Sequence, residues 1–275
     1  MSNKINIKAV TIGSDFELFL VDAENKYISA IPFIEGTKED PKPLSPFGHA
    51  IQADGTLFEA NVPPVPLTSV EEMWNDIQFV LETAKEHLPK ELKLKCCTNG
   101  IYEESQLDDP KARLAGCDPD FNAWDGGNSN PKPDISENPK RCCGFHIHIA
   151  FPGAEPSSGM RLMRLLDVNI ALPLLFIDED RERRLLYGKA GSFRFKDYGE
   201  VTGLEYRALS NCVIKDKETF EFVIQQLRQS INDYNEGKDY LPHKQNIEEA
   251  INNYNLNIAE ELCEQFGVPS PLKPA

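Results

Sequence analysis

Three short segments of the chain place ionisable side chains two residues apart, the repeat that aims both side chains at one face of a β-strand, and a further segment carries two carboxylates five residues apart. The segments are Asp15-Phe16-Glu17, the acidic stretch from Asp54 to Glu59, His146-Ile147-His148 and Glu205-Tyr206-Arg207. In the first, third and fourth segments the intervening residue is apolar or aromatic. The pattern predicts a sheet with one face in the core and the other face forming a site.

Carboxylates and imidazoles gathered on one sheet face repel and desolvate one another unless cations or a ligand neutralise them. Such a group therefore predicts bound metal ions. Asp, Glu and neutral His, together with water, suit Mg²⁺ or Mn²⁺, and the chain offers no usable cysteine cluster for a structural zinc site. Arg207 lies on the same predicted strand as Glu205, which indicates that an anion such as phosphate is the third component.

Length and composition favour one domain over residues 1–275. The chain is long enough for a core that stands without disulfides, and neither a low-complexity linker nor an internal repeat divides it. The Pro-rich stretches 41–46, 63–66 and 131–139 are interpreted as long ordered loops.

The formal net charge of −15 disfavours a nucleic-acid partner, because phosphate backbones are bound by basic patches. Cations are nevertheless concentrated in one stretch, where a smaller anion could be held. This stretch contains Arg181, Arg183, Arg184, Lys189, Arg194, Lys196 and Arg207. For the first three arginines, a solvated helix end is as good an explanation as substrate binding.

Seven cysteines, with two adjacent pairs, fit neither a disulfide framework nor a Cys-x-x-Cys metal site. They indicate reduced thiols in a cytoplasmic protein, and no N-terminal signal pattern is visible. The most apolar run, residues 168–177, is much shorter than the roughly 20 residues that span a bilayer. It predicts a buried helix and no membrane partner.

The hydrophobic periodicity predicts an α+β protein with a mainly antiparallel β-sheet, one face covered by helices and one face open. Strands are expected at 8–22, 27–30, 49–62, 92–98, 143–151 and 203–210, and helices at 69–87, 157–177, 216–234 and 245–265. Asp54 and Glu59 would face opposite sides of an uninterrupted strand, so a turn or bulge at Gly55 is required for both to serve one site. Residues 105–141 are interpreted as a long substrate-side loop.

Five motifs follow one another along about residues 11–210. They are Gly13-Ser14-Asp15-Phe16-Glu17, Ala53-Asp54-Gly55 leading to Glu59, Gly144-Phe145-His146-Ile147-His148, the segment from Tyr187 to Arg194, and Leu204-Glu205-Tyr206-Arg207. In this order they resemble the carboxylate-amine ligases of the glutamine synthetase and glutamate-cysteine ligase fold, and in particular the phage-type COOH-NH2 ligases, or amidoligases. The resemblance implies a curved sheet like that of the glutamine synthetase catalytic domain, with two or more Mg²⁺ ions between ATP and a carboxylate substrate.

The resemblance also assigns roles to single residues. It implies that Glu17 and Glu59 bind one metal ion, and that Asp15, His146 and Glu205 bind another. It implies phosphate contacts for His148, Lys189, Arg194 and Arg207, and catalytic roles for Arg194, Arg207 and Glu59. Asp15 stands where glutamine synthetase has a glutamate, and the role of Asp54 stays open.

The function expected from these residues is amide formation through an acyl phosphate, with ATP and Mg²⁺ or Mn²⁺ as cofactors. The expected partners are small-molecule or peptide carboxylates and amines. Two alternatives remain: an ATP phosphotransferase of the related guanidino kinase fold, and a non-catalytic protein that binds divalent cations. Arg194 and Arg207 disfavour the second alternative, because they would oppose cation capture without an anion present.

Overall fold

In the computed structural model, which describes residues 4–114, 120–153, 156–178, 181–197 and 202–270, one sheet of 11 strands organises the chain. Its path is β3-β4-β5-β1-β11-β13-β12-β8-β9, and β2 and β6 pair with β1 off this path. The central strands are β5 (Leu57–Pro66), β1 (Thr11–Val21), β11 (Phe145–Ala150), β13 (Thr202–Tyr206) and β12 (Ser192–Asp197). The pairs along this path are antiparallel.

Shorter strands complete the sheet. They are β2 (Tyr27–Ile28), β3 (Lys42–Pro43), β4 (Ala50–Asp54), β6 (Lys93–Lys95), β8 (Phe121–Asn122) and β9 (Asn128–Ser129). A separate pair is formed by β7 (Asn99–Ile101) and β10 (Lys140–Cys142). Because β10 leads directly into β11, this small pair lies next to the central strands.

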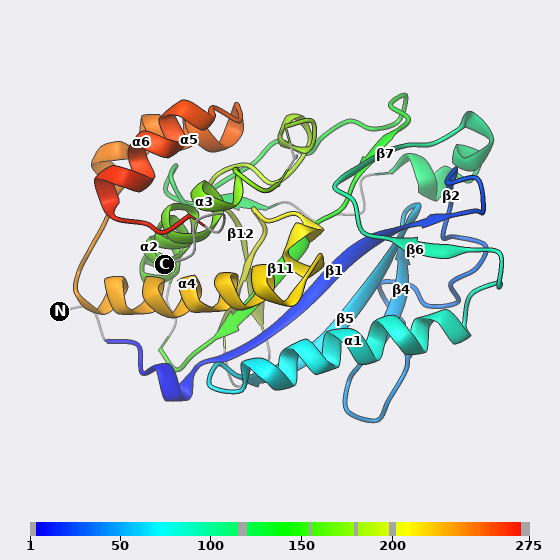
Figure 1. Cartoon of the computed structure of the whole chain (residues 1–275), viewed down its shortest axis with the longest axis horizontal. Helices are drawn as coiled ribbons and strands as arrows, with labels where there is room; N and C mark the ends of the chain where they lie inside the picture. The colour runs from blue at the N-terminus through cyan, green and yellow to red at the C-terminus, as the bar shows by residue number, and fades with distance from the viewer. Residues whose placement is uncertain (1–3, 115–119, 154–155, 179–180, 198–201, 271–275) are drawn as a thin grey trace.

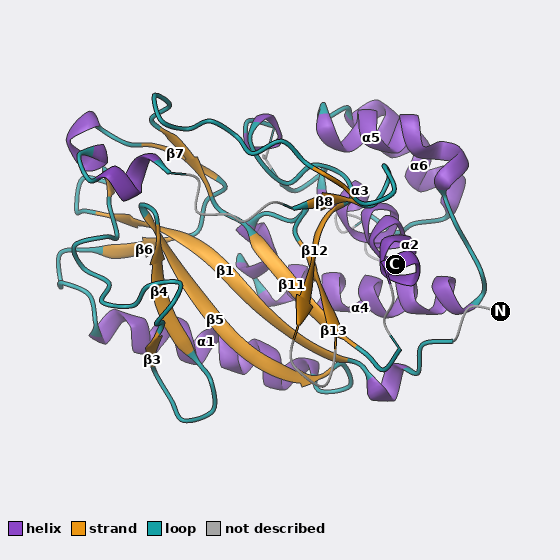
Figure 2. Cartoon of the chain, turned by 180° about the vertical axis from the view of Figure 1, so that it is seen from behind, coloured by secondary structure: helices purple, strands orange, loops and turns teal. Residues whose placement is uncertain are grey.

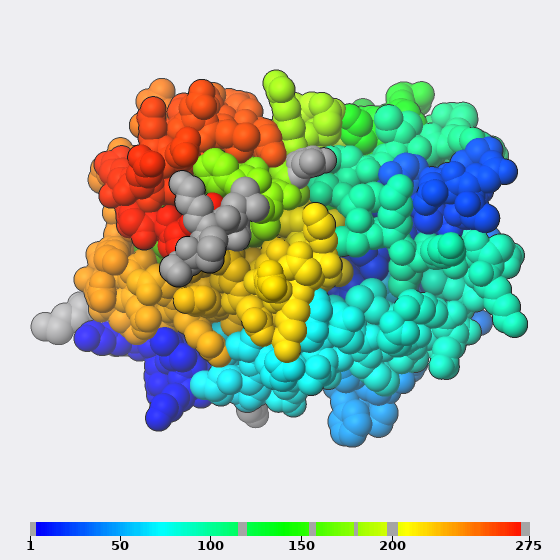
Figure 3. All heavy atoms as spheres, in the orientation of Figure 1, coloured from blue at the N-terminus to red at the C-terminus, as the bar shows by residue number. Residues whose placement is uncertain are grey.

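Two long helices, α1 (Val70–Glu86) and α4 (Lys217–Asn235), lie along one face of the sheet (Figure 1). In the space-filling view they form one continuous layer (Figure 3). From behind, the strands lie in front of both helices (Figure 2). The other helical segments are α2 (Pro156–Leu166), a π-helix (Asp167–Ala171), α3 (Leu172–Leu174), α5 (Lys244–Asn252) and α6 (Leu256–Phe266). Short 3-10 helices occur at Ile7–Ala9, Glu104–Leu107, Pro110–Arg113, Arg183–Leu185, Asn211–Ile214 and Leu241–His243.

The core forms between the sheet and these helices, because β1 and α1 each present one apolar side. In β1, Phe16 is fully buried, and its ring stacks on that of Phe145 in β11 at a centroid distance of 6.5 Å. α1 buries Met73, Ile77, Val80 and Ala84, which share one side of a 3.6-residue helix. Trp74 meets Phe220 at 5.3 Å and joins α1 to α4. The opposite sheet face is thereby left for the polar residues of β1.

The predicted α+β class, the mainly antiparallel sheet and its helix-covered face are confirmed. The required turn at Gly55 is also present: β4 and β5 form a hairpin around Gly55, whose φ is +55°, a value that favours glycine. In this register Gln52 lies opposite Glu59. Asp54 and Glu59 can therefore reach the same region.

Two segments that were each predicted to be one continuous α-helix are interrupted in the structure. The segment expected as one helix over 157–177 changes at Asp167 into a π-helix, a local insertion that apolar periodicity does not encode. The helix expected over 245–265 is divided between α5 and α6 at Tyr254, whose φ is +53°.

Three expected loops contain strands. Pro63–Pro66 belongs to β5, whose register with β1 shifts between Ile12 and Ser14, so a bulge accommodates the prolines. The stretch 41–46 contains β3, and the described part of 105–141 contains β8, β9 and the start of β10.

The buried-helix prediction for the apolar run agrees with the structure in its burial: Val168, Ile170 and Leu172 have no exposed surface. None of the helices in the described ranges is long and apolar enough to cross a membrane. Cys96, Cys97, Cys143 and Cys263 are free thiols, as expected for reduced cysteines.

Candidate functional site

The strand register brings the predicted site residues together on the sheet face opposite α1 and α4. Asp15 lies opposite His146, and Glu17 lies opposite Glu59. One strand further, Glu205 has His148 on one side and Arg194 on the other. A solvated strand face is excluded, because Asp15 is 7%, Glu59 8% and Glu205 0% exposed.

Glu17, Asp54 and Glu59 form a carboxylate cluster, each offering an oxygen atom within 4.8 Å of the others. Burial, followed by repulsion from Asp54, raises the pKa of Glu17 to about 7. Burial and the neighbouring carboxylates raise the pKa of Glu59 well above its ordinary value, and burial is the main cause of a raised pKa at Asp54. Three oxygen donors that repel one another are suited to a divalent cation such as Mg²⁺.

Glu205 lies at the centre of an adjacent ion-pair network. Arg207 donates to Glu205 Oε1, and Lys196 Nζ lies 2.7 Å from Oε2. Arg194 Nη1 lies 3.6 Å from Oε1. Burial alone would raise the pKa of Glu205, but the cations, Arg207 foremost, outweigh it and lower the pKa to about 2. Glu205 is therefore an ionised group that is already compensated by protein cations.

Asp15 lies between the two histidines of β11. Its Oδ1 is 2.7 Å from His146 Nδ1, and its Oδ2 is 3.2 Å from His148 Nε2. Burial raises the pKa of Asp15, yet His148 and His146 outweigh this effect and hold the pKa well below its ordinary range. Burial and Arg207 lower the pKa of His146 to about 4.

The second set of candidate metal ligands differs in one position from the set implied by the resemblance. Asp15, His148 and Glu205 each offer an atom within 4.8 Å of the others, whereas His146 was expected in place of His148. The physical reason is that His146 Nδ1 is held by Asp15 and lies 3.4 Å from Arg207 Nη1. Asp54, whose role was open, joins Glu17 and Glu59.

Three adjoining cavities lie along this face, and Arg207 lines all of them. The polar cavity, about 700 Å³, is lined by Asp15, Lys38, Pro41, Gln52, Asp54, Glu59, Asn61, His146, His148, Arg194, Lys196 and Arg207. The inner cavity, about 690 Å³, has among its lining residues Glu17, Asp54, Gly144, His146, Leu114, Ile135, Lys140 and Arg141. The loop cavity, about 680 Å³, lies between residues 130–133 and 185–189.

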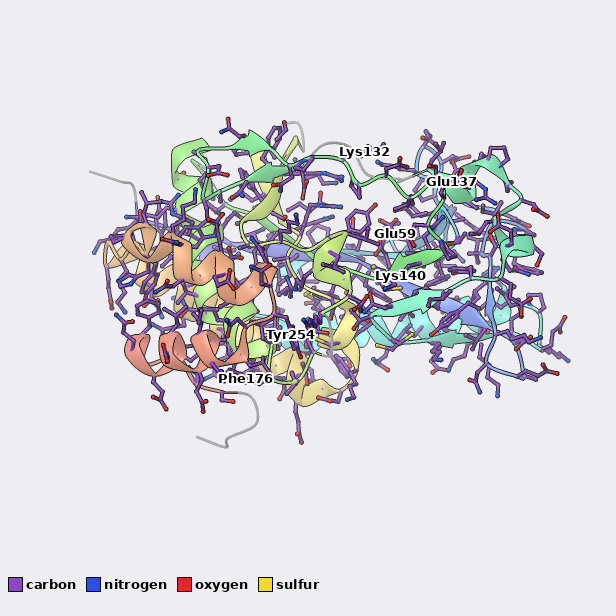
Figure 4. The ribbon with its side chains drawn as sticks, turned by 90° about the horizontal axis from the view of Figure 1, so that it is seen from above. Glu59, Lys132, Glu137, Lys140, Phe176 and Tyr254 are labelled. Carbon is purple, nitrogen blue, oxygen red and sulfur yellow. The ribbon has the colours of Figure 1, made fainter. Side chains whose placement is uncertain are left out.

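The long loop forms an outer wall of this region. In the view from above, Lys132 and Glu137 lie on the loop, and Glu59 and Lys140 lie inward of it (Figure 4). Asp120, the residue before β8, lines both the inner cavity and the loop cavity. The described part of 105–141 therefore lies beside these cavities, residues 115–119 lie outside the described residues, and the role of this loop at the substrate stays a prediction.

The structure divides the predicted phosphate-binding residues between cavities. His148, Arg194 and Arg207 line the polar cavity, whereas Lys189 lines the loop cavity. Lys196 was not predicted as a site residue, although it stands two residues after Arg194. The sign was the two-residue spacing, which was missed because no strand was expected over residues 192–197, where the structure has β12.

Arg183 and Arg184 are buried, so the alternative of a solvated helix end was wrong for them. Their guanidinium groups donate to main-chain oxygens that follow β13: Arg183 Nη2 to Leu209 O at 2.7 Å, and Arg184 Nη1 to Ala208 O at 2.8 Å. These hydrogen bonds hold the main chain directly after Arg207 in place. A burial of this kind depends on the tertiary fold, and no sequence spacing indicates it.

On the core side of β13, Asp167 joins segments that surround the site. Its Oδ1 accepts from the Tyr206 hydroxyl at 2.7 Å, and its Oδ2 accepts from Trp124 Nε1 at 2.6 Å and from the Gly191 N–H at 2.5 Å. Tyr206 stands between Glu205 and Arg207 in the sequence. Trp124, for which only packing was expected, therefore also contributes to the support of the site.

One protein-family model matches part of the chain. A family model described as "Phage phiEco32-like COOH.NH2 ligase-type 2" matches residues 137–257. This match confirms the resemblance drawn from the motifs, over the part of the chain that contains His146, His148, Arg194, Glu205 and Arg207. No curated protein matches the chain by sequence.

Similarity to solved structures is weak. A bifunctional glutathione synthetase from Pasteurella multocida has 14% identity and a TM-score of 0.45, with 96% of this chain and 48% of that chain covered. A Plasmodium falciparum glutamine synthetase has 10% identity and a TM-score of 0.42, with coverages of 84% and 52%. Apo GmaS has 12% identity and a TM-score of 0.38, with coverages of 94% and 69%. The chain spans about half the length of the first two proteins.

Proposed function

We propose that this protein is an ATP- and Mg²⁺-dependent ligase that joins a carboxylate to an amine through an acyl phosphate. The observation that carries the proposal is the meeting of the carboxylate cluster with the guanidinium groups of Arg194 and Arg207 on one concave sheet face. Carboxylates alone suit a cation, and guanidinium groups alone suit an anion. Together they suit a metal-nucleotide complex. The family match over residues 137–257 supports the same class.

The donor sets fit divalent metal ions. Glu17, Asp54 and Glu59 would hold one ion, and Asp15, His148 and Glu205 would hold a second. Burial, together with repulsion from neighbouring carboxylates, raises the pKa values of Glu17 and Glu59, and a bound cation would favour their ionised forms. When bound, Mg²⁺ would neutralise charge on the triphosphate and on the acid substrate.

The protein groups have separate tasks in phosphoryl transfer. Arg194 and Arg207, with Lys196 beside them, would donate hydrogen bonds to phosphate oxygens in the polar cavity, whereas His148, first expected at the phosphates, would hold the second metal ion. Glu59 would act through the carboxylate cluster. An oxygen of the substrate carboxylate attacks the γ-phosphorus of ATP, ADP leaves, and an acyl phosphate forms.

Amide formation completes the reaction. The amine nitrogen attacks the acyl carbon, the bond from that carbon to the phosphate oxygen breaks, and inorganic phosphate leaves while the nitrogen loses a proton. The buried position of the site, with loop 130–137 outside it, supports exclusion of water, which would otherwise hydrolyse the acyl phosphate. The substrates we propose are a small-molecule or peptide carboxylate and an amine. We also propose that one domain carries out the whole reaction.

The test is product analysis with Mg²⁺, ATP and a panel of amino acids and amines. A ligase releases ADP and phosphate. Its product has the summed mass of the acid and the amine minus one water, which mass spectrometry detects. A guanidino kinase-like phosphotransferase would instead release ADP and form a phosphorylated acceptor without an amide. A non-catalytic cation-binding protein would release no ADP with any acceptor.

A further inference from the structure

Asp167 is a buried carboxylate that belongs to neither candidate metal site. It has no exposed surface and begins the π-helix Asp167–Ala171. Three donors bond its carboxylate, the Tyr206 hydroxyl, Trp124 Nε1 and the Gly191 N–H, and none of the three carries a charge. Burying an ionised group among neutral donors is unfavourable for stability, and π-helical turns are frequent at functional sites. The position of Asp167 therefore indicates a role other than stability.

Asp167 joins the ends of two strands that carry site residues. The hydroxyl of Tyr206, the last residue of β13, donates to Oδ1 at 2.7 Å. The N–H of Gly191, directly before β12, donates to Oδ2 at 2.5 Å. The next residue along each chain is bonded too, because the Arg207 N–H donates to Ser192 O at 3.0 Å. The carboxylate therefore fixes the two chains relative to each other at the point where Arg207 follows β13.

The third donor, Trp124 Nε1, ties the segment after β8 to the same carboxylate at 2.6 Å. Within this segment the Ala123 N–H donates to Gly191 O at 3.0 Å. Gly191 has a φ of +72°, and a Cβ atom there would lie 2.7 Å from Trp124 Cδ1. The absence of a side chain at Gly191 lets both chains approach Asp167 closely. Because the packing is this tight, a change in the length of one of these hydrogen bonds has to move a chain.

A carboxylate suits these donors better than an amide of the same shape. Both carboxylate oxygens accept, and a hydroxyl bonded to an ionised oxygen approaches to about 2.5–2.7 Å. An amide would turn its NH₂ group toward the Tyr206 oxygen, and N–H···O distances are about 2.9 Å. Asp167→Asn should therefore keep the fold but displace Tyr206 by roughly 0.2 Å. Tyr206 stands between Glu205 and Arg207, so the displacement reaches the site.

We infer that Asp167 is a positioning residue for Arg207 and Arg194 at the phosphates. Arg207 directly follows Tyr206, and Arg194 comes three residues after Gly191. Both guanidinium groups line the polar cavity, whereas Asp167 bonds Tyr206 on the core side of the sheet. Asp167 touches no ligand in this arrangement, and it acts by holding β12 and β13 together. The inference rests on the proposed ligase function, which supplies the phosphates.

The experiment measures the affinity of the full chain for a non-hydrolysable ATP analogue with Mg²⁺, by calorimetric titration. Asp167→Asn and Tyr206→Phe are each expected to weaken this binding roughly tenfold, because small misplacements of ligand-binding groups are costly. Urea unfolding at pH 7 should show that Asp167→Asn is at least as stable as the wild type, since a buried charge is removed. A folded Asp167→Asn that binds the analogue within threefold of the wild type overturns the inference. If this variant does not fold, Tyr206→Phe, which retains the ring, decides by the same criterion.

Asp233→Asn is the matched control. Asp233 is a second buried carboxylate, 2% exposed, and lies on α4. It accepts from Asn169, Gln229 and Lys238, and none of these residues lines the polar, inner or loop cavity. Asp233→Asn should bind the analogue within about threefold of the wild type, even where its stability falls. Equal weakening by Asp233→Asn and Asp167→Asn would show a general effect of losing a buried carboxylate, and would overturn the inference.

Turnover of the same samples separates this inference from the proposed function. Asp167→Asn should lower kcat for ADP formation while KM for the amine stays within about threefold, because Asp167 acts on the phosphate contacts. Amide formation with equal analogue binding by all variants would retain the ligase and remove the role of Asp167. Weaker binding by Asp167→Asn in a protein that forms no amide would retain the positioning role and remove the ligase. A wild-type protein that binds no analogue overturns both.

Discussion

The carboxylate of Glu17 accepts a 2.6 Å hydrogen bond from the N–H of Gly144, and the N–H of Glu17 donates to Gly144 O at 3.0 Å. This double link joins β1 to the entry of β11, just beyond the pair formed by Phe16 and Phe145. A Cβ atom at position 144 would lie 2.8 Å from His146 Nε2 and 3.4 Å from Glu17 Oε2. Gly144 thus leaves room for Glu17, a candidate metal ligand, and for His146, which contacts Asp15.

Gly144→Ala is expected to displace His146 and to reduce kcat/KM for ADP release by roughly 10²-fold, because small misplacements of reacting groups are costly. The loss of stability should be at most about 1 kcal/mol, since only a side-chain end has to move. Steady-state kinetics and thermal unfolding measure the two effects. Gly237→Ala is the control: its φ of +83° makes it strained, but nothing lies near its Cβ position. Full activity of Gly144→Ala would contradict the predicted geometry.

Glu59→Gln is expected to weaken Mn²⁺ binding by about tenfold or more while keeping the metal-free fold at least as stable. The reason is that Glu59 contributes charge to the cation site, whereas its burial beside Asp15, Asp54 and Glu17 is unfavourable without a cation. Titration of Mn²⁺ followed by electron paramagnetic resonance, and urea unfolding without metal, test the two parts. Glu24→Gln, on an exposed turn, is the control. Unchanged Mn²⁺ affinity would remove Glu59 from the metal site.

Arg207→Lys should lower kcat by on the order of 10³-fold, although the charge is kept, because lysine lacks the planar fork that reaches both Glu205 and a phosphate oxygen. Arg207 also lines the polar, inner and loop cavities. Single-turnover measurement of ADP formation separates this effect from nucleotide binding. Arg228→Lys on α4, whose guanidinium donates to Leu67 O, is a remote control. Near-normal turnover of Arg207→Lys would exclude it from the phosphate contacts.

Much of the site could be predicted because its information is local. A two-residue spacing decides which face of a strand carries Asp15, Glu17, His146 and His148, and the glycine at 55 permits the hairpin that Asp54 and Glu59 require. The order of the motifs along the chain then predicted that these faces meet. The antiparallel register supplies the remaining precision, since Asp15 falls opposite His146 and Glu17 opposite Glu59.

Other features depend on the fold as a whole. His146 and His148 share one face of β11, and only the neighbouring strands decide that His148 faces Glu205 while His146 bonds Asp15. Arg141 and Arg183 are buried, and their guanidinium groups donate to main-chain carbonyls from distant parts of the chain. Neither position has a sequence pattern that distinguishes it from a solvated arginine.

Asp167 gives the stability of the protein a specific pH dependence. Burial raises the pKa of Asp167 from 3.8 to about 6, although Tyr206, Trp124 and the Gly191 N–H donate to its carboxyl group. Below pH 3.8 the group is protonated in both the folded and the unfolded chain, so it carries no electrostatic cost. Between pH 3.8 and about 6 the unfolded chain releases this proton first, and the free energy of unfolding falls as the pH rises.

Asp167→Asn should remove this dependence, because the amide cannot ionise and can still accept from Trp124 and Gly191 while donating to the Tyr206 oxygen. The variant is therefore expected to gain stability relative to the wild type between pH 4 and pH 7, by at most about 3 kcal/mol. Urea unfolding of both proteins at the two pH values measures the change, with the exposed Glu260→Gln as a control that should show none. If the difference between Asp167→Asn and the wild type is the same at pH 4 and pH 7, Asp167 does not titrate in this range, and its hydrogen bonds hold it ionised throughout.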